Sequence, residues 1–288
     1  MKINENTEKL NKIKIVGIVL KPDSPEIKDI YFKIKAYFEN EGIEVLLENN
    51  SAQMIGFKGV SFDDVCGTCD FLVSVGGDGT LISVARRAYR FEKPLLGIHL
   101  GTLGFLTDIM LKEVPTFIDK LKNDEYRIDK RMMIEGVTSS KRYVAFNDIV
   151  LTRKTVNSML KVDAKIDGKL FNSYHGDGII ISTPTGSTAY NLSIGGPLVY
   201  PLTNAFIVTP IAPHSLTQRP LVLPANFVIE FKITDKKGAV IIIDGQDSYE
   251  IEHGESIKIE IAHKKAKLIH RIERNYFEVL NDKLQWGD

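Results

Sequence analysis

The sequence has little cysteine, no excess of charge and no long apolar run. Its 288 residues include two cysteines, Cys66 and Cys69, in a Cys-x-x-Cys arrangement. A structural zinc site needs a second pair of Cys or His ligands at a similar spacing, and the sequence has none. A thioredoxin-like pair follows a strand and opens a helix, whereas this pair precedes an expected strand. We therefore interpret both cysteines as ordinary reduced thiols.

The absence of net charge narrows the range of functions. The 37 basic side chains balance the 37 acidic ones, which argues against general binding to nucleic acid or to anionic membranes. No apolar run has the length of a membrane-spanning helix. Residues 1–12 are polar and lack the apolar centre of a signal peptide. The sequence therefore predicts a cytoplasmic protein without nucleic-acid or membrane partners.

Several well-known motifs are also missing. The sequence contains no Gly-x-x-x-x-Gly-Lys-Ser/Thr loop, no Gly-x-Gly-x-x-Gly fingerprint, no Gly-x-Ser-x-Gly elbow and no His-Glu-x-x-His pair. A nucleotide-binding function must therefore be argued from other residues.

Apolar strand and helix patterns alternate over residues 1–129. Strands are predicted at residues 14–20, 43–47, 71–75 and 94–99, and helices at residues 27–40 and from about 80 to 89. This alternation predicts an α/β domain in which helices flank a parallel sheet. Ligands of such sheets bind at the carboxyl ends of the strands.

Beyond residue 130, short β-rich runs replace the helical pattern. Strands are predicted at residues 131–137, 143–153, 160–166, 178–182, 227–233, 239–244 and 256–262. We assign residues 130–271 to a mainly antiparallel, β-sandwich-like C-terminal domain. Residues 272–288 regain a helical pattern and are predicted to pack back on the first domain.

A glycine-rich turn follows the strand at residues 71–75. Gly76, Gly77 and Gly79 let the backbone approach a ligand closely, and Thr80 is expected to cap the next helix. The backbone N–H groups of such a turn suit a phosphate. Asp78 is unfavourable beside phosphates unless it accepts a substrate proton or holds a divalent cation. The alternative is an ordinary Asp-Gly turn.

Other polar clusters occur further along the chain. Residues 100–106 form a second glycine-rich strand-to-helix junction, expected at the same sheet edge as Asp78 unless they are a plain loop. Asn147 and Asp148 could bind ribose hydroxyls or a base, or form a solvent-facing strand end. The hydroxyl-rich residues 183–190, near His175 and Asp177, suit phosphate or sugar oxygens, or form a turn without a ligand. Residues 244–246, read alone, indicate a hairpin turn.

These motifs occur in a recognisable order. They are Gly-Gly-Asp-Gly-Thr at 76–80, Leu-Gly-Phe-Leu at 103–106, Phe-Asn-Asp at 146–148, Thr-Pro-Thr-Gly-Ser-Thr-Ala-Tyr at 183–190, Gly-Gly-Pro at 195–197, His-Ser-Leu-Thr-x-Arg-Pro at 214–220 and Asp-Gly-Gln at 244–246. Together they resemble the NAD kinase family over most of the chain. Gly-Gly-Asp-Gly is also found in diacylglycerol kinases, sphingosine kinases and phosphofructokinases, whereas the 183–190 motif is highly specific.

The resemblance implies a two-domain NAD kinase-like fold and a phosphotransferase activity. Such an enzyme transfers the γ-phosphoryl group of ATP to the 2′-hydroxyl of the adenosine ribose of NAD and makes NADP. It also implies a divalent cation such as Mg²⁺, with no ligands assigned, and a homodimer or homotetramer. Residues 1–129 would form the nucleotide-binding domain, and residues 130–271 the NAD-binding domain.

The resemblance further implies roles for individual residues. Asp78 matches the family's proton acceptor, and Gly76, Gly77, Gly79 and Thr80 are the expected phosphate-binding residues. Asn147 and Asp148 would meet the ribose and adenine region, and Asp177 the nicotinamide end, which it could reach across a subunit interface. The full expected NAD-binding set is Asp78, Gly79, Asn147, Asp148, His175, Asp177, Thr185, Thr188, Ala189, Tyr190, Asn191, Leu192, Ser193, Ala212 and Gln246.

The chain departs from the family pattern at three positions. It has Asp148 where Glu is frequent, His99 where Asn is frequent, and Thr102 where a basic residue is common. Two alternatives remain at this point: a lipid or sugar kinase that shares the Gly-Gly-Asp-Gly fold, and a non-catalytic dinucleotide sensor. The first predicts an apolar groove or sugar site in place of an adenine pocket. The second predicts dinucleotide binding without turnover.

Overall fold

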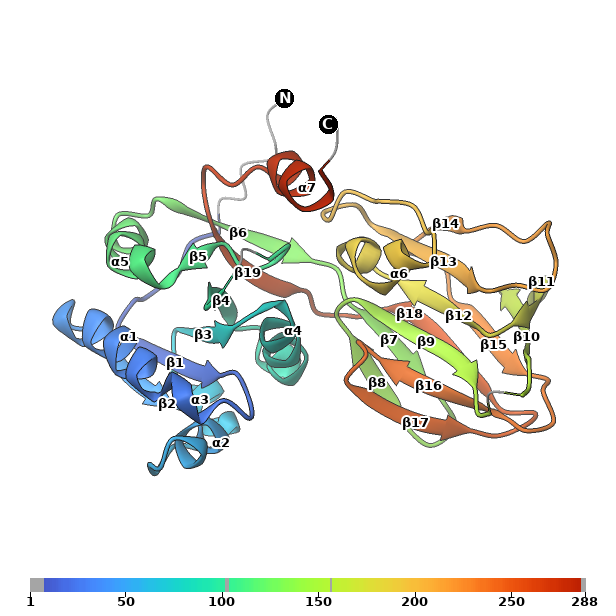
Figure 1. Cartoon of the computed structure of the whole chain (residues 1–288), viewed down its shortest axis with the longest axis horizontal. Helices are drawn as coiled ribbons and strands as arrows, with labels where there is room; N and C mark the ends of the chain where they lie inside the picture. The colour runs from blue at the N-terminus through green and yellow to red at the C-terminus, as the bar shows by residue number, and fades with distance from the viewer. Residues whose placement is uncertain (1–7, 102–103, 156, 286–288) are drawn as a thin grey trace. The chain divides into compact units, whose positions relative to one another are not determined.

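The chain folds into two units, shown in a computed structural model that describes residues 8–101, 104–155 and 157–285 (Figure 1). The first unit comprises Met1–Lys130 and Ala266–Asp288, and the second comprises Arg131–Lys265. Residues 266–271, which the sequence pattern assigned to the second domain, therefore belong to the first unit. The reason is that they form a strand of its sheet.

The first unit is built on one sheet with the strand order β2-β1-β3-β4-β19-β6, and β5 pairs with β4. The strands are β1 (Ile15–Leu20), β2 (Glu44–Leu47), β3 (Phe71–Gly76), β4 (Pro94–His99), β5 (Ile109–Met110), β6 (Tyr126–Arg131) and β19 (Ala266–Arg271). From β2 to β19 and from β4 to β5 the neighbours are parallel. The parallel α/β sheet predicted from the alternating pattern is confirmed.

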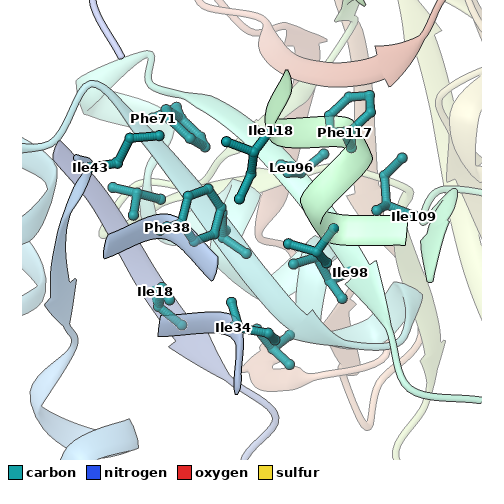
Figure 2. Close-up of a cluster of buried hydrophobic side chains, with 14 of the residues drawn as sticks. Ile18, Ile34, Phe38, Ile43, Phe71, Leu96, Ile98, Ile109, Phe117 and Ile118 are labelled. Carbon is teal, nitrogen blue, oxygen red and sulfur yellow. The ribbon is translucent and has the colours of Figure 1, made fainter. Parts of the chain in front are cut away.

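Helices cover both faces of this sheet. The helices of the first unit are η1 (Pro25–Ile27), α1 (Lys28–Asn40), α2 (Asn49–Met54), α3 (Phe62–Thr68), α4 (Asp78–Arg87), η2 (Tyr89–Phe91), η3 (Leu111–Glu113), α5 (Val114–Lys122) and α7 (Tyr276–Leu284). On one face, Ile34 and Phe38 of α1 and Phe117 of α5 meet Leu96 and Ile98 of β4 in the core (Figure 2). The apolar residues of α1 recur at helical spacing, so α1 is amphipathic and packs its apolar side against this face of the sheet.

The opposite face shows where glycine is needed for close packing. A Cβ at Gly17 of β1 would lie 2.4 Å from Val65 of α3, and one at Gly97 of β4 would lie 2.6 Å from Leu81 of α4.

Cys66 and Cys69 are buried and free. Burial raises the pKa of the Cys66 thiol to about 12 and that of Cys69 to about 11. Both are therefore protonated and unreactive at neutral pH.

The second unit consists of two six-stranded sheets. Their orders are β11-β10-β15-β18-β7-β8 and β14-β13-β12-β9-β16-β17, and the strands pair antiparallel. The strands are β7 (Ile134–Val137), β8 (Arg142–Ala145), β9 (Asp148–Arg153), β10 (Leu160–Ile166), β11 (Lys169–Gly176), β12 (Gly178–Ser182), β13 (Ala205–Ile211), β14 (Leu221–Pro224), β15 (Ile229–Ile233), β16 (Ala239–Ile243), β17 (Asp247–Ile251) and β18 (Ser256–Ile261). An apolar core lies within this unit.

The structure corrects three local predictions. Residues 143–153, expected as one strand, are interrupted at Phe146 and Asn147 between β8 and β9. The junction at residues 100–106 leads into the short strand β5 rather than directly into a helix. Strands β5, β6, β11, β13, β14, β17 and β19 were not predicted from the sequence. Among the helices of the described residues, none has both the length and the apolar character needed to cross a bilayer.

Candidate active site

The carboxylate of Asp78 lies at the start of α4. The N-cap is Gly77 and Asp78 is the first helical residue, so the helix begins before Thr80, which was expected from the sequence to be its cap. Thr80 lies inside the first turn and is buried. Asp78 thus lies at the carboxyl end of β3 and at the positive end of the α4 dipole, where a negative charge is stabilised.

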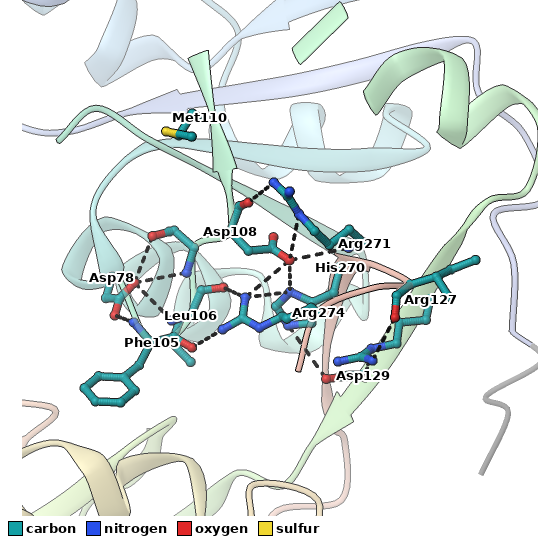
Figure 3. A network of polar contacts seen from close by, with 12 residues as sticks. Asp78, Phe105, Leu106, Asp108, Met110, Arg127, Asp129, His270, Arg271 and Arg274 are labelled. Carbon is teal, nitrogen blue, oxygen red and sulfur yellow. Dashed lines mark hydrogen bonds and ion pairs between the residues drawn. The ribbon is translucent and has the colours of Figure 1, made fainter. Parts of the chain in front are cut away.

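Residues 105–107 surround this carboxylate with donors. The N–H of Phe105 donates to Oδ2 at 2.7 Å (Figure 3). The N–H groups of Leu106 and Thr107 donate to Oδ1 at 3.2 and 3.1 Å, and the Thr107 hydroxyl donates to the same oxygen at 3.0 Å. Oδ1 therefore accepts three hydrogen bonds and Oδ2 accepts one. This leaves Oδ2 as the oxygen with capacity to accept a further proton donor.

This arrangement requires glycine at position 104. A Cβ at Gly104 would lie 2.0 Å from Oδ1 of Asp78, which is inside van der Waals contact. The glycine of the Leu-Gly-Phe-Leu motif therefore allows residues 105–107 to enclose the carboxylate. Leu103 of the same motif, and Thr102, lie outside the described residues.

The glycine turn before α4 exposes backbone rather than side chains. A Cβ at Gly76 would lie 2.4 Å from the Thr80 hydroxyl, whereas one at Gly77 or Gly79 would meet no atom of the described residues within 4 Å. Gly77 and Gly79 are exposed. A cavity of about 250 Å³ lies between α4, from Thr80 to Arg87, and residues at the end of β1 and in α2, and the turn glycines do not line it. The exposed backbone of the turn therefore lies at a helix N-terminus, and the expected role of the turn in phosphate binding stays a prediction.

His99 lies in register with Gly76, at the carboxyl end of β4. Its side chain is buried, with 3% of its surface exposed. Neither ring nitrogen has a hydrogen-bond partner among the described residues. A buried imidazole without partners is unfavourable.

A buried ionic network lies behind residues 105–108, within the first unit (Figure 3). Oδ2 of Asp108 is 3.3 Å from Nδ1 of His270 and 3.4 Å from Nη1 of Arg274. Burial raises the pKa of Asp108, but His270, Arg274 and Arg271 more than offset this effect and bring it to about 2. Burial, together with Arg274, lowers the pKa of His270.

None of these network residues was predicted from the sequence. They come from segments far apart in the chain, so they form no local motif. The charged run His-Arg-Ile-Glu-Arg at residues 270–274, directly after apolar residues, is the signal that could have indicated them.

In the second unit, Asn147 and Asp148 lie where β8 ends and β9 begins. The carboxylate of Asp244 accepts the N–H groups of Phe146, Asn147 and Asp148 at 2.8, 2.7 and 2.9 Å. Asp244 has a left-handed backbone, φ 49°, as does Gly245, φ 65°, so the predicted hairpin turn is present between β16 and β17. Its carboxylate also ties this turn to the Asn147 segment, a role the sequence did not predict.

Asp148 has a raised pKa and lies next to the carboxylate of Asp244. Burial, together with the charge of Asp244, raises the pKa of Asp148 to about 7. Asp244 itself accepts the three N–H groups described above. Asn147 is also buried, and its Oδ1 has no hydrogen-bond partner in the described part of the chain. An amide oxygen and a partly protonated carboxyl group therefore occupy adjacent positions of this strand end.

The hydroxyl-rich segment packs against Asn147. The backbone N–H of Thr183 donates to the Asn147 carbonyl at 2.8 Å, and a Cβ at Gly186 would lie 2.3 Å from the same oxygen. Thr185 is buried, and its hydroxyl has no partner among the described residues. The segment forms the short helices η4 (Thr185–Thr188) and α6 (Tyr190–Ser193).

Residues 188–193 divide by exposure. Tyr190 and Ser193 are exposed, and Thr188, Ala189 and Leu192 are partly exposed. Asn191 is completely buried, and its side chain contacts Thr209 at 2.6 Å and the carbonyls of Ser187 and Pro197. Its side chain therefore fixes the loop internally.

A third group of predicted residues meets at the end of β11. The carbonyl of His175 accepts the N–H of His214 at 2.9 Å, and that of Ile211 accepts the N–H of Asp177 at 3.0 Å. Asp177 also forms an ion pair with Arg153 at 2.7 Å. Ala212 has a positive φ of 42°. A Cβ at Gly176 would lie 2.8 Å from the Ala212 carbonyl, so this glycine allows the strands to meet.

No preformed metal centre is found in the described ranges, since they hold no group of three or more His, Cys, Asp or Glu that could bind an ion. Mg²⁺ is commonly held by one or two carboxylates together with substrate phosphates. The Oδ2 atom of Asp78 fits such a limited role. Gln246 is exposed in the β16–β17 turn.

Family models match both parts of the chain. The model described as the ATP-NAD kinase N-terminal domain matches residues 16–126, and the model described as the ATP-NAD kinase C-terminal domain matches residues 146–271. An NAD kinase of Sulfurimonas denitrificans is 51% identical over 280 residues, which cover 96% of this chain and 98% of that protein. An NAD kinase of Wolinella succinogenes is 49% identical over 283 residues, which cover 97% and 98%.

Two solved structures are also similar. A yeast NADH kinase complexed with NADH has a TM-score of 0.89 and 26% sequence identity, and the match covers 96% of this chain and 89% of that one. An NAD kinase from Archaeoglobus fulgidus in complex with ATP has a TM-score of 0.77 and 27% identity, with 94% and 98% covered.

Proposed function

The chain belongs to the ATP-NAD kinase family, and we propose from this premise that it transfers the γ-phosphoryl group of ATP to the 2′-hydroxyl of the adenosine ribose of NAD. The products are NADP and ADP. The observation that carries the proposal is the Asp78 carboxylate, which is fixed at the start of α4 with Oδ2 able to accept one more hydrogen bond.

Asp78 acts as the general base in this proposal. Its Oδ2 accepts the proton of the 2′-hydroxyl as the oxygen forms a bond to the γ-phosphorus, and the bond between that phosphorus and the β,γ-bridging oxygen of ATP breaks. A ribose hydroxyl is a weak nucleophile at neutral pH, and a positioned carboxylate contributes about 10²–10⁴-fold to the rate. The three hydrogen bonds on Oδ1 fix the orientation of the base without occupying Oδ2.

The phosphates are assigned to the glycine turn. The exposed backbone at Gly77 and Gly79, together with the N-terminal end of α4, suits negatively charged oxygens. Gly76 and Thr80 are buried and pack closely against each other, so they support the conformation of the turn. A divalent cation would be held by the substrate phosphates, because the remaining acceptor position of Asp78 is assigned to the proton of the 2′-hydroxyl, and when bound the cation neutralises phosphate charge.

The NAD is assigned to residues of the second unit. The Asn147 amide and the Asp148 carboxyl group supply polar contacts for ribose and adenine, and Thr185 supplies a buried hydroxyl without a partner among the described residues. The exposed or partly exposed side chains of residues 188–190, 192 and 193 supply the wall of the pocket, to which Gln246 is also assigned. His175, Asp177 and Ala212 are assigned to the nicotinamide end. Asn191 holds the loop rather than the ligand.

A coupled assay for NADP formation from NAD, ATP and Mg²⁺ tests the proposal. We expect product from the wild type and about 10²–10⁴-fold lower kcat for Asp78→Asn with unchanged NAD affinity. Asp167→Asn, at an exposed hairpin turn, is the control and should keep full activity. An Asp78→Asn protein that binds NAD and turns over at the wild-type rate would exclude Asp78 as the base.

Other substrates distinguish the alternative functions. Product only with another nucleoside triphosphate or polyphosphate changes the donor and keeps the reaction class. Phosphorylation of a diacylglycerol or a sugar in place of NAD supports the lipid or sugar kinase. NAD binding with no turnover on any donor supports the sensor. The cytoplasmic location and the homodimer or homotetramer remain predictions, which fractionation and light scattering can test.

A further inference from the structure

The segment that encloses Asp78 is also bound from its other side. Arg274 donates from Nη2 to the carbonyl of Phe105, and from Nη1 to the carbonyl of Leu106 at 3.1 Å. These carbonyls share their peptide units with the N–H groups of Leu106 and Thr107, which donate to Oδ1 of Asp78. Two consecutive peptide units therefore each connect the guanidinium to the carboxylate (Figure 3).

The geometry of the peptide unit makes this connection stiff. A peptide unit is planar, and in the trans form its C=O and N–H point in opposite directions. A shift of the carbonyl end therefore moves the N–H end as well. The cation lies at the negative end of each peptide dipole and the carboxylate at the positive end, so each hydrogen bond strengthens the next.

Arg274 is itself held in place. Its side chain is 5% exposed, and Nη1 lies 3.4 Å from Oδ2 of Asp108 and 3.1 Å from Nδ1 of His270. It follows β19 by three residues and lies beyond the matched range 146–271. A buried arginine requires a compensating charge, which Asp108 supplies. The four partners of Arg274 thus leave its guanidinium little freedom.

We propose that Arg274 is a positioning residue for Asp78, and that it acts through the peptide units that join residues 105–106 and 106–107. The proposal rests on the assignment of Asp78 as the general base. Its consequence is that the C-terminal segment, which returns to the first unit after the second unit is complete, sets the orientation of the catalytic carboxylate. Activity therefore depends on a contact formed by a segment that follows both sheets of the second unit in the chain.

Arg274→Lys is the first test. Lysine keeps a positive charge beside Asp108, but its single ammonium group cannot reproduce the planar fork that serves both carbonyls. A displacement of about 1 Å in a catalytic group can lower the rate by about 10²-fold. We expect kcat to fall about 10- to 100-fold while KM for NAD stays within about twofold. If Arg274→Lys only destabilised the fold, the fraction of folded enzyme would fall, and the folded enzyme would keep the wild-type kcat and KM.

Arg271→Lys is the matched control. Arg271 contacts the same Asp108 and also Glu113, whereas the carbonyls of Phe105 and Leu106 are bound by Arg274. We expect the kcat of Arg271→Lys to stay within about twofold of the wild type, since the peptide units beside Asp78 keep their partner. If Arg274→Lys does not fold, the pair Arg274→Gln with Asp108→Asn removes both buried charges together and permits the same measurements.

Amide hydrogen exchange gives a readout that does not depend on turnover. The amides of Leu106 and Thr107 should exchange faster in Arg274→Lys, and should be unchanged in Arg271→Lys. In an Asp78→Asn background, Arg274→Lys should cause no further loss of kcat, because coupled residues are not additive. Unchanged exchange, or unchanged kcat in an active enzyme, would overturn the inference. Faster exchange in a protein that makes no NADP would uphold the positioning role and reject the proposed function.

Discussion

At the scale of single residues, the buried Asp148 lowers the folding stability of the ligand-free protein at neutral pH. It is buried, it lies beside the charge of Asp244, and these two effects raise its pKa to about 7. In the unfolded chain an aspartate ionises near pH 4. The folded state therefore binds a proton between about pH 4 and 7 that the unfolded state has released, and stability falls as the pH rises through this range.

Asp148→Asn should remove this pH dependence. The raised pKa corresponds to a penalty of about 4 kcal/mol above pH 7, as an upper estimate. We expect the variant to match the wild type near pH 4 and to become the more stable of the two as the pH rises to about 8. Urea unfolding at both pH values measures this difference. If the difference in unfolding free energy between Asp148→Asn and the wild type is the same at both pH values, Asp148 is not the titrating group.

Gly104 gives a second prediction at this scale. Gly104→Ala would place a Cβ 2.0 Å from Oδ1 of Asp78, whereas a Cβ at Gly101 would meet no atom of the described residues within 4 Å. We expect Gly104→Ala to displace the carboxylate and to lower kcat about 10- to 100-fold. Gly101→Ala, as the control, should retain the wild-type kcat. Equal kcat values for the two variants would contradict the close approach.

At the scale of elements, Asp244 connects two strand ends. Its carboxylate takes three consecutive N–H groups at the β8–β9 break, while its own backbone forms the β16–β17 turn. The arrangement explains why β8 ends at Ala145. The N–H groups of residues 146–148 are directed to a side chain instead of a neighbouring strand at this point.

Asp244→Asn tests this connection. Asparagine tolerates the left-handed backbone but keeps only one acceptor oxygen, so at least one of the three N–H groups loses its partner. We expect a loss of about 1–3 kcal/mol in unfolding free energy and weaker NAD binding, measured by calorimetry. Asp167→Asn is matched to it, since Asp167 has φ 51° in another Asp-Gly turn, and it should leave NAD binding unchanged. Intact NAD binding in both variants would show that the hydrogen bonds accepted by Asp244 from residues 146–148 do not influence NAD binding.

Elements with a clear local pattern could be predicted from the sequence. The amphipathic α1, the apolar strands β1, β3 and β4, and the turn at Gly76–Gly79 follow from spacing and glycine content alone. A strand end at Asn147–Asp148 was one alternative from the sequence, but the contact with Asp244 could not be predicted, because Asp244 is remote in the sequence. The start of α4 at Asp78 was also missed, since Gly77 caps it by backbone geometry and not by a side chain.

At the scale of the whole molecule, the order of the chain and the order of the sheet differ. Strand β19 comes after all strands of the second unit, yet it lies between β4 and β6. The apolar residues within 266–271 are compatible with a strand, but periodicity does not show which sheet they join. The Arg274 contacts and the Asp108 network depend on this return, so the sequence could suggest Asp78 but not the residues that support it.

The return of β19 predicts different behaviour for the two units expressed alone. The buried core of the second unit lies entirely within residues 131–265, so this fragment should fold and unfold cooperatively in urea. Residues 1–130 lack β19, whose Leu268 and Ile269 are buried. They also leave Asp108 without His270 and Arg274, and an unpaired buried charge costs about 3–5 kcal/mol.

We therefore expect residues 1–130 alone to show no cooperative unfolding by circular dichroism, and a peptide of residues 266–288 to restore it when added in excess. The added peptide supplies the missing strand together with His270 and Arg274 for Asp108, and its binding free energy adds to stability by mass action. The same peptide with Arg274→Lys should bind more weakly. Cooperative unfolding of residues 1–130 without the peptide would show that β19 completes the sheet without being needed for its stability.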